Sequence, residues 1–381
     1  MNELSKKNGR TRTLLVGVLL LVAVAVAALL VPRLRKTATP QQSARRIPIV
    51  GQIPPVRQIA QSKQTTHIAA PTAPMGADHQ NDLRLSLPPA NVHPIASQIR
   101  LQRVLKYGRE EGELGMIRAH EQSPVGPESF ACGINGKVFL ADLVNQRILV
   151  YSADGVYLRK IDLPGIVLND IALDERGDIY VYDQVQRTLH QLDSQGTTVS
   201  DLKLDPADIG TRGYFHVVGN SVYFADAAAR DILVATIQDG VLMAEDSTVD
   251  RISEGIHAKS DLVYSLSLVR GQAMQVHVRS EDQSVTPLHL DVPVSGIVSA
   301  TYLGEDQTRR FYVQTERMVD NTIVLEVHAF GSTGEKLAVT RIPENDYALW
   351  TTRLLTVGAD GALVQFLPKV NQAKLIFFAR Y

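Results

Sequence analysis

Short hydrophobic runs, separated by polar residues, recur along most of the chain after residue 128. The stretch GKVFLADLVNQRILVYSADG, from Gly136 to Gly155, contains two such runs, separated by polar residues and closed by a turn sequence. Short runs rich in β-branched and aromatic residues are typical of β-strands, and Asn-Gly or Asp-Gly pairs are typical of the turns between them. With ESFACGING before it and VYLRKIDL after it, the stretch predicts four successive antiparallel strands over residues 128–163.

The same pattern returns 41 residues later, from Gly177 to Gly196. A weaker third copy contains YFHVVGNSVYFADAAARDILVATIQDG, and strand-like runs continue at similar spacing to the C-terminus. Units of 40 to 50 residues with four strands each are typical of propeller blades, whereas a β-solenoid, the alternative, has shorter coils. We therefore expect an all-β chain in which residues 98–381 form a six-bladed β-propeller of four-stranded antiparallel blades.

A strand that closes the ring is also expected, because a propeller leaves open sheet edges unless its last blade joins its first. The C-terminal runs RLLTVGAD, GALVQFLP and KLIFFARY supply only three strands. The run IRLQRVLKYG, residues 99–108, resembles the outer strand VYLRKIDL and is expected to complete this blade.

Residues 13–32 form an apolar run without a charged side chain, long enough as a helix to cross a bilayer. It predicts a transmembrane helix that acts as a signal anchor; a cleaved signal peptide is the alternative. Residues 1–12 are a short basic tail, and residues 33–97 are rich in Pro, Gln and Ala, which predicts a disordered linker. A short basic tail favours the cytosol, so the propeller is expected on the extracytoplasmic, in bacteria periplasmic, side.

Composition narrows the choice of partners. The formal net charge of -1 provides no field that would attract nucleic acid, and nucleic acid is not expected as a partner. The single cysteine, Cys132, excludes an internal disulfide. The sequence contains no Gly-x-Ser-x-Gly, Walker or His-Glu-x-x-His motif, so no residue is assigned a catalytic role.

The repeat resembles that of NHL-type six-bladed propellers, in which a strand ends in Asp and is followed by Asn and Arg before the next strand. The first copy matches this pattern at Gly136, Val138, Phe139, Asp142, Asn145, Arg147, Ile148, Val150, Tyr151 and Gly155. The second copy has Gln186 and Thr188 in place of the Asn and the Arg. The resemblance implies the fold, but propellers of this type include scaffolds, RNA binders and enzymes.

Binding residues are expected where loops surround one mouth of the channel, and the loops DLVNQR and LPGIVLND are expected to rim the same opening. The candidates at this mouth are Asp142, Asn145, Asn169, Asp170, Asp183, His216, Asp226 and His257. Recurrence in successive blades favours a structural role in turns for Asp142, Asp183, Asp226 and Arg147. Residues that are not repeated and precede or begin inner strands are better candidates: Glu128, Ser129, Asn169, Asp170, Tyr214, His216, Glu254, His257, Trp350 and Thr351.

A second resemblance concerns Asn169 and Asp170, which are similar to an Asn-Asp pair of gluconolactonase and regucalcin-like propellers. It implies a divalent cation such as calcium, held by oxygen ligands, which polarises a lactone carbonyl for attack by water. The chain departs from that family at Val125, where the family carries a Glu. No cofactor is otherwise predicted.

Two hypotheses for function remain. In the first, the chain is a membrane-anchored, extracytoplasmic NHL-like propeller that acts as a binding or scaffold module for a protein, peptide or glycan partner. In the second, it is a divalent-cation-dependent hydrolase of the lactonase type, with Asn169 and Asp170 as metal ligands. The tether favours the first hypothesis, under which the chain is not an enzyme.

Overall fold

The computed structural model describes residues 99–118, 123–205, 209–210, 212–244, 251–269, 273–280 and 283–380. The predicted basic tail, membrane segment and linker, residues 1–97, lie outside the described residues. Within the described part of the chain, no helix is long and apolar enough to cross a membrane.

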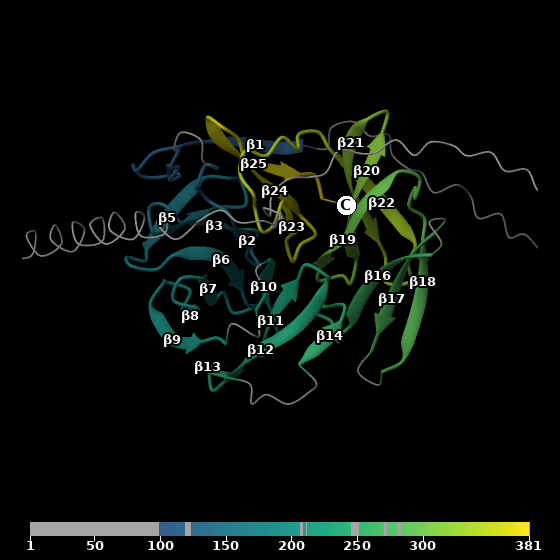
Figure 1. The fold of residues 1–381 in the computed structure, drawn as a ribbon, viewed down its shortest axis with the longest axis horizontal. Helices are drawn as coiled ribbons and strands as arrows, with labels where there is room; N and C mark the ends of the chain where they lie inside the picture. Colours follow the sequence, from purple (N-terminus) through teal and green to yellow (C-terminus); the bar gives the residue numbers. More distant parts are fainter. Residues whose placement is uncertain are drawn as a thin grey trace, which may run out of the picture. The chain divides into compact units, whose positions relative to one another are not determined.

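The described residues form six antiparallel sheets that follow one another around a ring, which is the six-bladed propeller that the repeats predict (Figure 1). Blade 1 contains β2 (Phe130–Cys132), β3 (Val138–Asp142), β4 (Arg147–Tyr151) and β5 (Tyr157–Asp162). Blade 2 contains β6 (Leu168–Leu173), β7 (Ile179–Asp183), β8 (Thr188–Leu192) and β9 (Thr198–Lys203). Both agree with the strands predicted from the first two copies of the repeat.

The remaining blades follow in order. Blade 3 contains β10 (Gly213–Val218), β11 (Ser221–Asp226), β12 (Arg230–Gln238), β13 (Val241–Ala244) and a fifth strand, β14 (Ile252–Glu254), which pairs with β12. Blade 4 contains β15 (Ile256–His257), β16 (Val263–Val269), β17 (Ala273–Arg279) and β18 (Val285–Leu290). Blade 5 contains β19 (Ile297–Glu305), β20 (Phe311–Val319), β21 (Thr322–Phe330) and β22 (Lys336–Ile342). The sequence analysis did not predict the additional strand β14.

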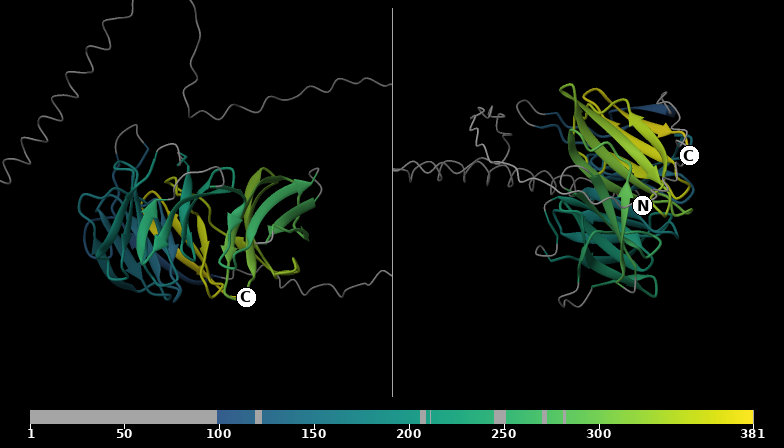
Figure 2. Two further views of the ribbon diagram at one scale, coloured as in Figure 1. Left: turned by 90° about the horizontal axis from the view of Figure 1, so that it is seen from below. Right: turned by 90° about the vertical axis from the view of Figure 1, so that its right-hand side faces the viewer.

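Blade 6 closes the ring as predicted. It contains β23 (Leu355–Val357), β24 (Leu363–Pro368), β25 (Gln372–Phe378) and, as its outer strand, β1 (Ile99–Lys106). The pairing runs from Ile99 opposite Phe378 to Lys106 opposite Gln372. In Figure 2 the blue first strand lies beside the yellow C-terminal strands. Closure therefore joins the two ends of the described chain through main-chain hydrogen bonds.

The hydrophobic core lies between neighbouring blades. Phe130 of blade 1 packs against Phe366 of blade 6, with ring centroids 5.9 Å apart, and both side chains are fully buried. Similar clusters join blade 1 to blade 2 and blade 2 to blade 3. The middle strands β3, β4 and β24 are buried along their whole length and are mostly apolar, while outer strands such as β5 alternate between more buried and more exposed positions.

The repeated glycines allow the hairpins to turn tightly. Gly155 has a φ of 65°, in the left-handed region, and a Cβ there would lie 3.1 Å from the Phe377 ring of blade 6. Glycine is favoured at this turn both by its conformation and by the close approach of the next blade.

Candidate functional site: the channel

The repeated aspartates Asp142, Asp183 and Asp226 each end the second strand of a blade. Their carboxylates accept backbone N–H groups of the following turn, from Asn145, Gln186 and Ala228 respectively. Asp142 and Asp183 are fully buried, and Asp226 also accepts two hydrogen bonds from the guanidinium of Arg230. This arrangement supports the structural role that the repetition favours.

Blade 1 uses this turn to hold the segment that follows β1. Arg147 Nε lies 3.0 Å from Asp142 Oδ2, and the Arg147 guanidinium also donates to the carbonyls of residues 109, 110 and 113. Asn145 donates to the Gly108 carbonyl at 2.9 Å. Asp142 and Asn145 therefore act in the joint between blades 6 and 1.

The loops DLVNQR and LPGIVLND, which are predicted to rim one opening of the channel, contact each other. The amide N–H of Gly165 donates to Gln146 Oε1 at 2.9 Å, and that of Leu163 donates to the Gln146 carbonyl at 2.8 Å.

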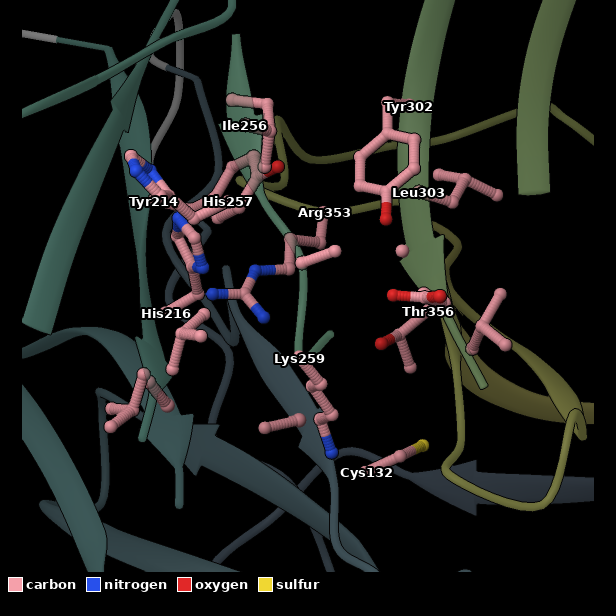
Figure 3. Close-up of a pocket in the computed structure, with 18 of the residues that line it drawn as sticks. Cys132, Tyr214, His216, Ile256, His257, Lys259, Tyr302, Leu303, Arg353 and Thr356 are labelled. Atoms are coloured by element: carbon pink, nitrogen blue, oxygen red, sulfur yellow. The ribbon is translucent and has the colours of Figure 1, made fainter. Parts of the chain in front are cut away.

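All six inner strands line a central channel, which contains two principal cavities. We call the first, of about 130 Å³, the Lys259 cavity; it lies between β2, β6, β10, β15, β19 and β23 (Figure 3). We call the second, of about 300 Å³, the Trp350 pocket; Ser299, Thr301, Gln314, Glu316 and Trp350 line it. The side chains of Tyr214, Tyr302 and Arg353 border both.

Arg353 separates the two cavities. Its guanidinium lies 4.4 Å from the centre of the Tyr214 ring, donates to the Phe215 carbonyl, and lies 3.9 Å from Asp170 Oδ2. Burial raises the pKa of Tyr214 to about 12, although the Arg353 charge opposes this, so the ring is a neutral platform for the cation.

Asn169 and Asp170 lie in a small third cavity of about 60 Å³, beside Glu128, Trp350 and Thr352. Asn169 Oδ1 accepts the backbone N–H of Gln184 at 3.1 Å. The Asp170 carboxylate is almost completely buried: it accepts hydrogen bonds from the Ser129 hydroxyl, the Phe215 N–H at 2.5 Å and the Thr352 hydroxyl at 3.4 Å. The two oxygens of Asp170 are thus already engaged within the fold.

These contacts do not fit a divalent cation at Asn169 and Asp170. A hard cation prefers several oxygen ligands with free lone pairs, but here the guanidinium of Arg353 is the cation beside Asp170. Among the described residues, no group of three or more His, Cys, Asp and Glu side chains could hold a metal ion.

His216 and His257 meet at a shared carboxylate that the sequence analysis did not single out. Asp231 Oδ1 lies 2.8 Å from His216 Nε2, and Asp231 Oδ2 lies 2.9 Å from His257 Nδ1. Tyr223 stacks on His257 with ring centroids 4.2 Å apart. Burial alone would raise the pKa of Asp231, but the charge of His216 and the hydrogen bonds from both histidines outweigh it and lower the pKa to about 2.

The structure thus brings the candidates together in two groups. Asn169 and Asp170 lie near Trp350, while His216 and His257 line the Lys259 cavity. Turns within or between blades hold the other four candidates, which are Asp142, Asn145, Asp183 and Asp226. Glu254 lies on β14, paired opposite Arg230 of β12.

Sequence reasoning missed Asp231, Arg353 and Tyr302. A signal existed for Asp231, because it follows the Arg position of the repeat, where the earlier copies have Ile148 and Leu189. A carboxylate at a position that is otherwise apolar and buried indicates a polar partner inside the fold. Tyr302 and Arg353 lie in blades whose repeat pattern is too degraded to offer such a comparison.

No family model and no curated protein matches the chain. The chain is similar to solved structures that include a streptogramin B lyase, at 12% identity over 72% of this chain and 97% of the other, with a TM-score of 0.39. Virginiamycin B lyase from Staphylococcus aureus matches at 12% identity over 70% and 99%, with a TM-score of 0.37. A member of the duf4221 family from Bacteroides vulgatus matches at 11% identity over 73% and 98%, with a TM-score of 0.42. At this distance the matches say nothing about a site, and the fold assignment rests on the strand pairing.

Proposed function

We propose that the chain is a single-pass membrane protein whose NHL-like propeller acts outside the cytoplasm as a binding module, and that it holds a peptide or glycan partner at the Trp350 pocket. The observation that carries the proposal is Trp350 itself. Its side chain is 56% exposed, beside a pocket of about 300 Å³. A large exposed aromatic side chain beside a concave site is typical of a binding anchor.

The lining of the Trp350 pocket suits a partner with many hydrogen-bonding groups. The residues that line the pocket include Ser299, Thr301, Gln314 and Glu316, which carry hydroxyl, amide and carboxylate groups, and Arg353. A pocket of this size is at the lower end for small ligands, so it would take one sugar ring or one side chain of a longer partner. Tryptophan offers such a group an apolar face together with an N–H donor.

Intrinsic fluorescence provides a direct test, because Trp350 is the only tryptophan in the chain. Purified full-length protein would be titrated with a set of oligosaccharides and, separately, with a set of peptides. We expect a saturable change in emission with members of one set and loss of binding in Trp350→Ala, measured by calorimetry. Val370→Ala, at an exposed position outside the pocket, is the matched control. Absence of saturable binding by both sets would reject the proposal.

The proposed orientation of the chain in the membrane requires a separate test. A reporter that is active only outside the cytoplasm, fused after Tyr381, should be active in cells that express the chain. Activity of a cytosolic reporter at the same position would instead reverse the proposed topology.

A further inference from the structure

The Lys259 cavity contains buried polar groups that lack partners among the described residues. Tyr302 Oη and Glu305 Oε1 are buried and have no hydrogen-bond partner there, and neither has Arg353 Nε. Tyr302 is 4% exposed and Glu305 is 6% exposed. Buried polar atoms are nearly always paired with protein, water or a ligand, so three such atoms around one cavity indicate a missing partner.

The three groups differ in what they require. The Arg353 N–H can only donate and the Tyr302 hydroxyl is free to donate, so both suit an acceptor such as a carboxylate. Glu305 accepts a hydrogen bond from Ser260 through Oε2 at 2.5 Å, and its other oxygen suits a donor. Tyr302 and Arg353 both line the cavity, on opposite sides of it in the view of Figure 3. A complementary ligand therefore carries an acceptor at one end and a donor at the other.

The charges around the cavity further restrict the chemical class of the ligand. The charged groups in and behind the cavity wall include the carboxylates of Asp170, Asp231, Glu305 and Asp360 and the permanent cations Lys259, Arg309 and Arg353. A simple anion would leave Glu305 Oε1 without a donor, and a simple amine would leave Arg353 Nε without an acceptor. A zwitterion satisfies both ends without adding net charge to the channel, which lowers the cost of burial.

Volume limits the size of the ligand. A cavity of 150 Å³ in another protein holds a benzene molecule, so the 130 Å³ here accommodates about six non-hydrogen atoms. We propose that the Lys259 cavity binds a small free amino acid of about the size of alanine, with its carboxylate toward Arg353 and Tyr302 and its ammonium group toward Glu305. This site lies beside the Trp350 pocket and shares Tyr302 and Arg353 with its wall, and the inference goes beyond the proposed function.

Calorimetry and thermal melting of purified full-length protein would test the site with alanine and glycine as probes. We expect saturable binding and a rise in melting temperature that grows with ligand concentration. Acetate, methylamine and lactate serve as half-ligands, and each should bind about tenfold more weakly than alanine, because each leaves at least one group without its charged partner. Equal binding of acetate or of lactate would overturn the assignment of the ammonium group, and no saturable binding of alanine would mean that the cavity holds only water.

Two variants locate the ligand. Tyr302→Phe removes only the unpartnered hydroxyl and Glu305→Gln removes only the charge, and each should weaken alanine binding about tenfold. Tyr151→Phe is the matched control: its hydroxyl binds the Gly112 carbonyl in blade 1, and alanine binding should be unchanged. Unchanged alanine affinity in the folded Tyr302→Phe protein would place the ligand elsewhere. Partner binding is read from Trp350 fluorescence and amino acid binding from calorimetry without partner, so the two proposals fail independently.

Discussion

His216 Nε2 lies 2.8 Å from Asp231 Oδ1, although β11 separates the two strands that carry these residues. The contact crosses the width of one strand because the Asp231 side chain is completely buried in blade 3 and the imidazole reaches it from the channel side. The second oxygen of the same carboxylate accepts from His257 at the start of blade 4. One carboxylate thus connects two blades at the channel wall.

This connection predicts a loss of stability in acid. The pKa of Asp231 is lower in the folded protein, at about 2, than its ordinary value of 3.8. The unfolded chain therefore binds the proton first, and the contribution of Asp231, about 2 kcal/mol, is present above pH 4 and disappears as pH falls toward 2. Urea unfolding at several pH values measures it. Asp231→Asn should flatten the dependence of stability on pH between pH 4 and 2, whereas Asp201→Asn, which changes a carboxylate that is 55% exposed beside His190, should not.

The burial of His328 predicts a second pH range in which the stability of the folded protein falls. Burial, together with the nearby charges of Lys336 and Arg317, lowers the pKa of His328 from 6.5 to about 4. Between these values the unfolded chain binds a proton that the folded protein does not, so stability should fall by about 3 kcal/mol as pH is lowered from 6.5 to 4. His328→Gln should remove this slope, measured by urea unfolding. A slope retained in His328→Gln but lost in the exposed control His289→Gln would contradict the prediction.

Asp142 should matter for stability. Its carboxylate is fully buried, pairs with Arg147 and accepts the Gly115 N–H at 2.8 Å. Asp142→Ala leaves a buried guanidinium without the carboxylate that neutralises it and should cost about 3–5 kcal/mol of unfolding free energy. Asp154→Ala removes a comparable contact to Arg100 at the surface and should cost less than about 1 kcal/mol. Equal costs for the two variants would show that burial does not decide the effect.

The closing strand β1 should be needed for the stability of the whole ring. Leu105 is buried against blade 6, while its neighbour Val104 is 51% exposed. Leu105→Ala should cost about 2–5 kcal/mol, and Val104→Ala within about 0.5 kcal/mol of zero. Deletion of residues 98–108 should lower the unfolding midpoint sharply, whereas deletion of residues 37–90 should leave it unchanged. Equal tolerance of both deletions would contradict this role.

Local repetition made most of the fold predictable. Gly136 and Asp142 recur as Gly177 and Asp183, and these residues form turns whose geometry depends only on neighbours a few positions away. The pairing of β1 with β25 was also predictable, because a ring needs a fourth strand and only one unassigned run had the outer-strand pattern. The strand β14 was not predictable, because its three residues are largely exposed and do not form a hydrophobic run.

The channel was less predictable because its contacts join residues far apart in sequence. Arg353 reaches Phe215 and Asp170, and no spacing in the sequence relates these positions. Asn169 and Asp170 could be singled out as candidates, but whether their oxygens were free or engaged depended on Ser129, Thr352 and Arg353, contributed by blades 1 and 6. The residue types alone indicated a polar site at this position. They could not distinguish an oxygen that is free to bind a metal from one that accepts hydrogen bonds within the fold.

The way β1 closes the ring also decides how the domain would respond to a pull. Tension applied through the chain before Ile99 arrives first at the ladder between β1 and β25, where seven residue pairs hold the strand in place. No other blade lies between that ladder and the applied force. Mechanical unfolding should therefore begin at blade 6, and peeling away β1 would uncover the edge of β25 before the remaining blades lose contact. In a propeller closed by its first strand, the pairing of that strand receives the applied force first and is the first to break.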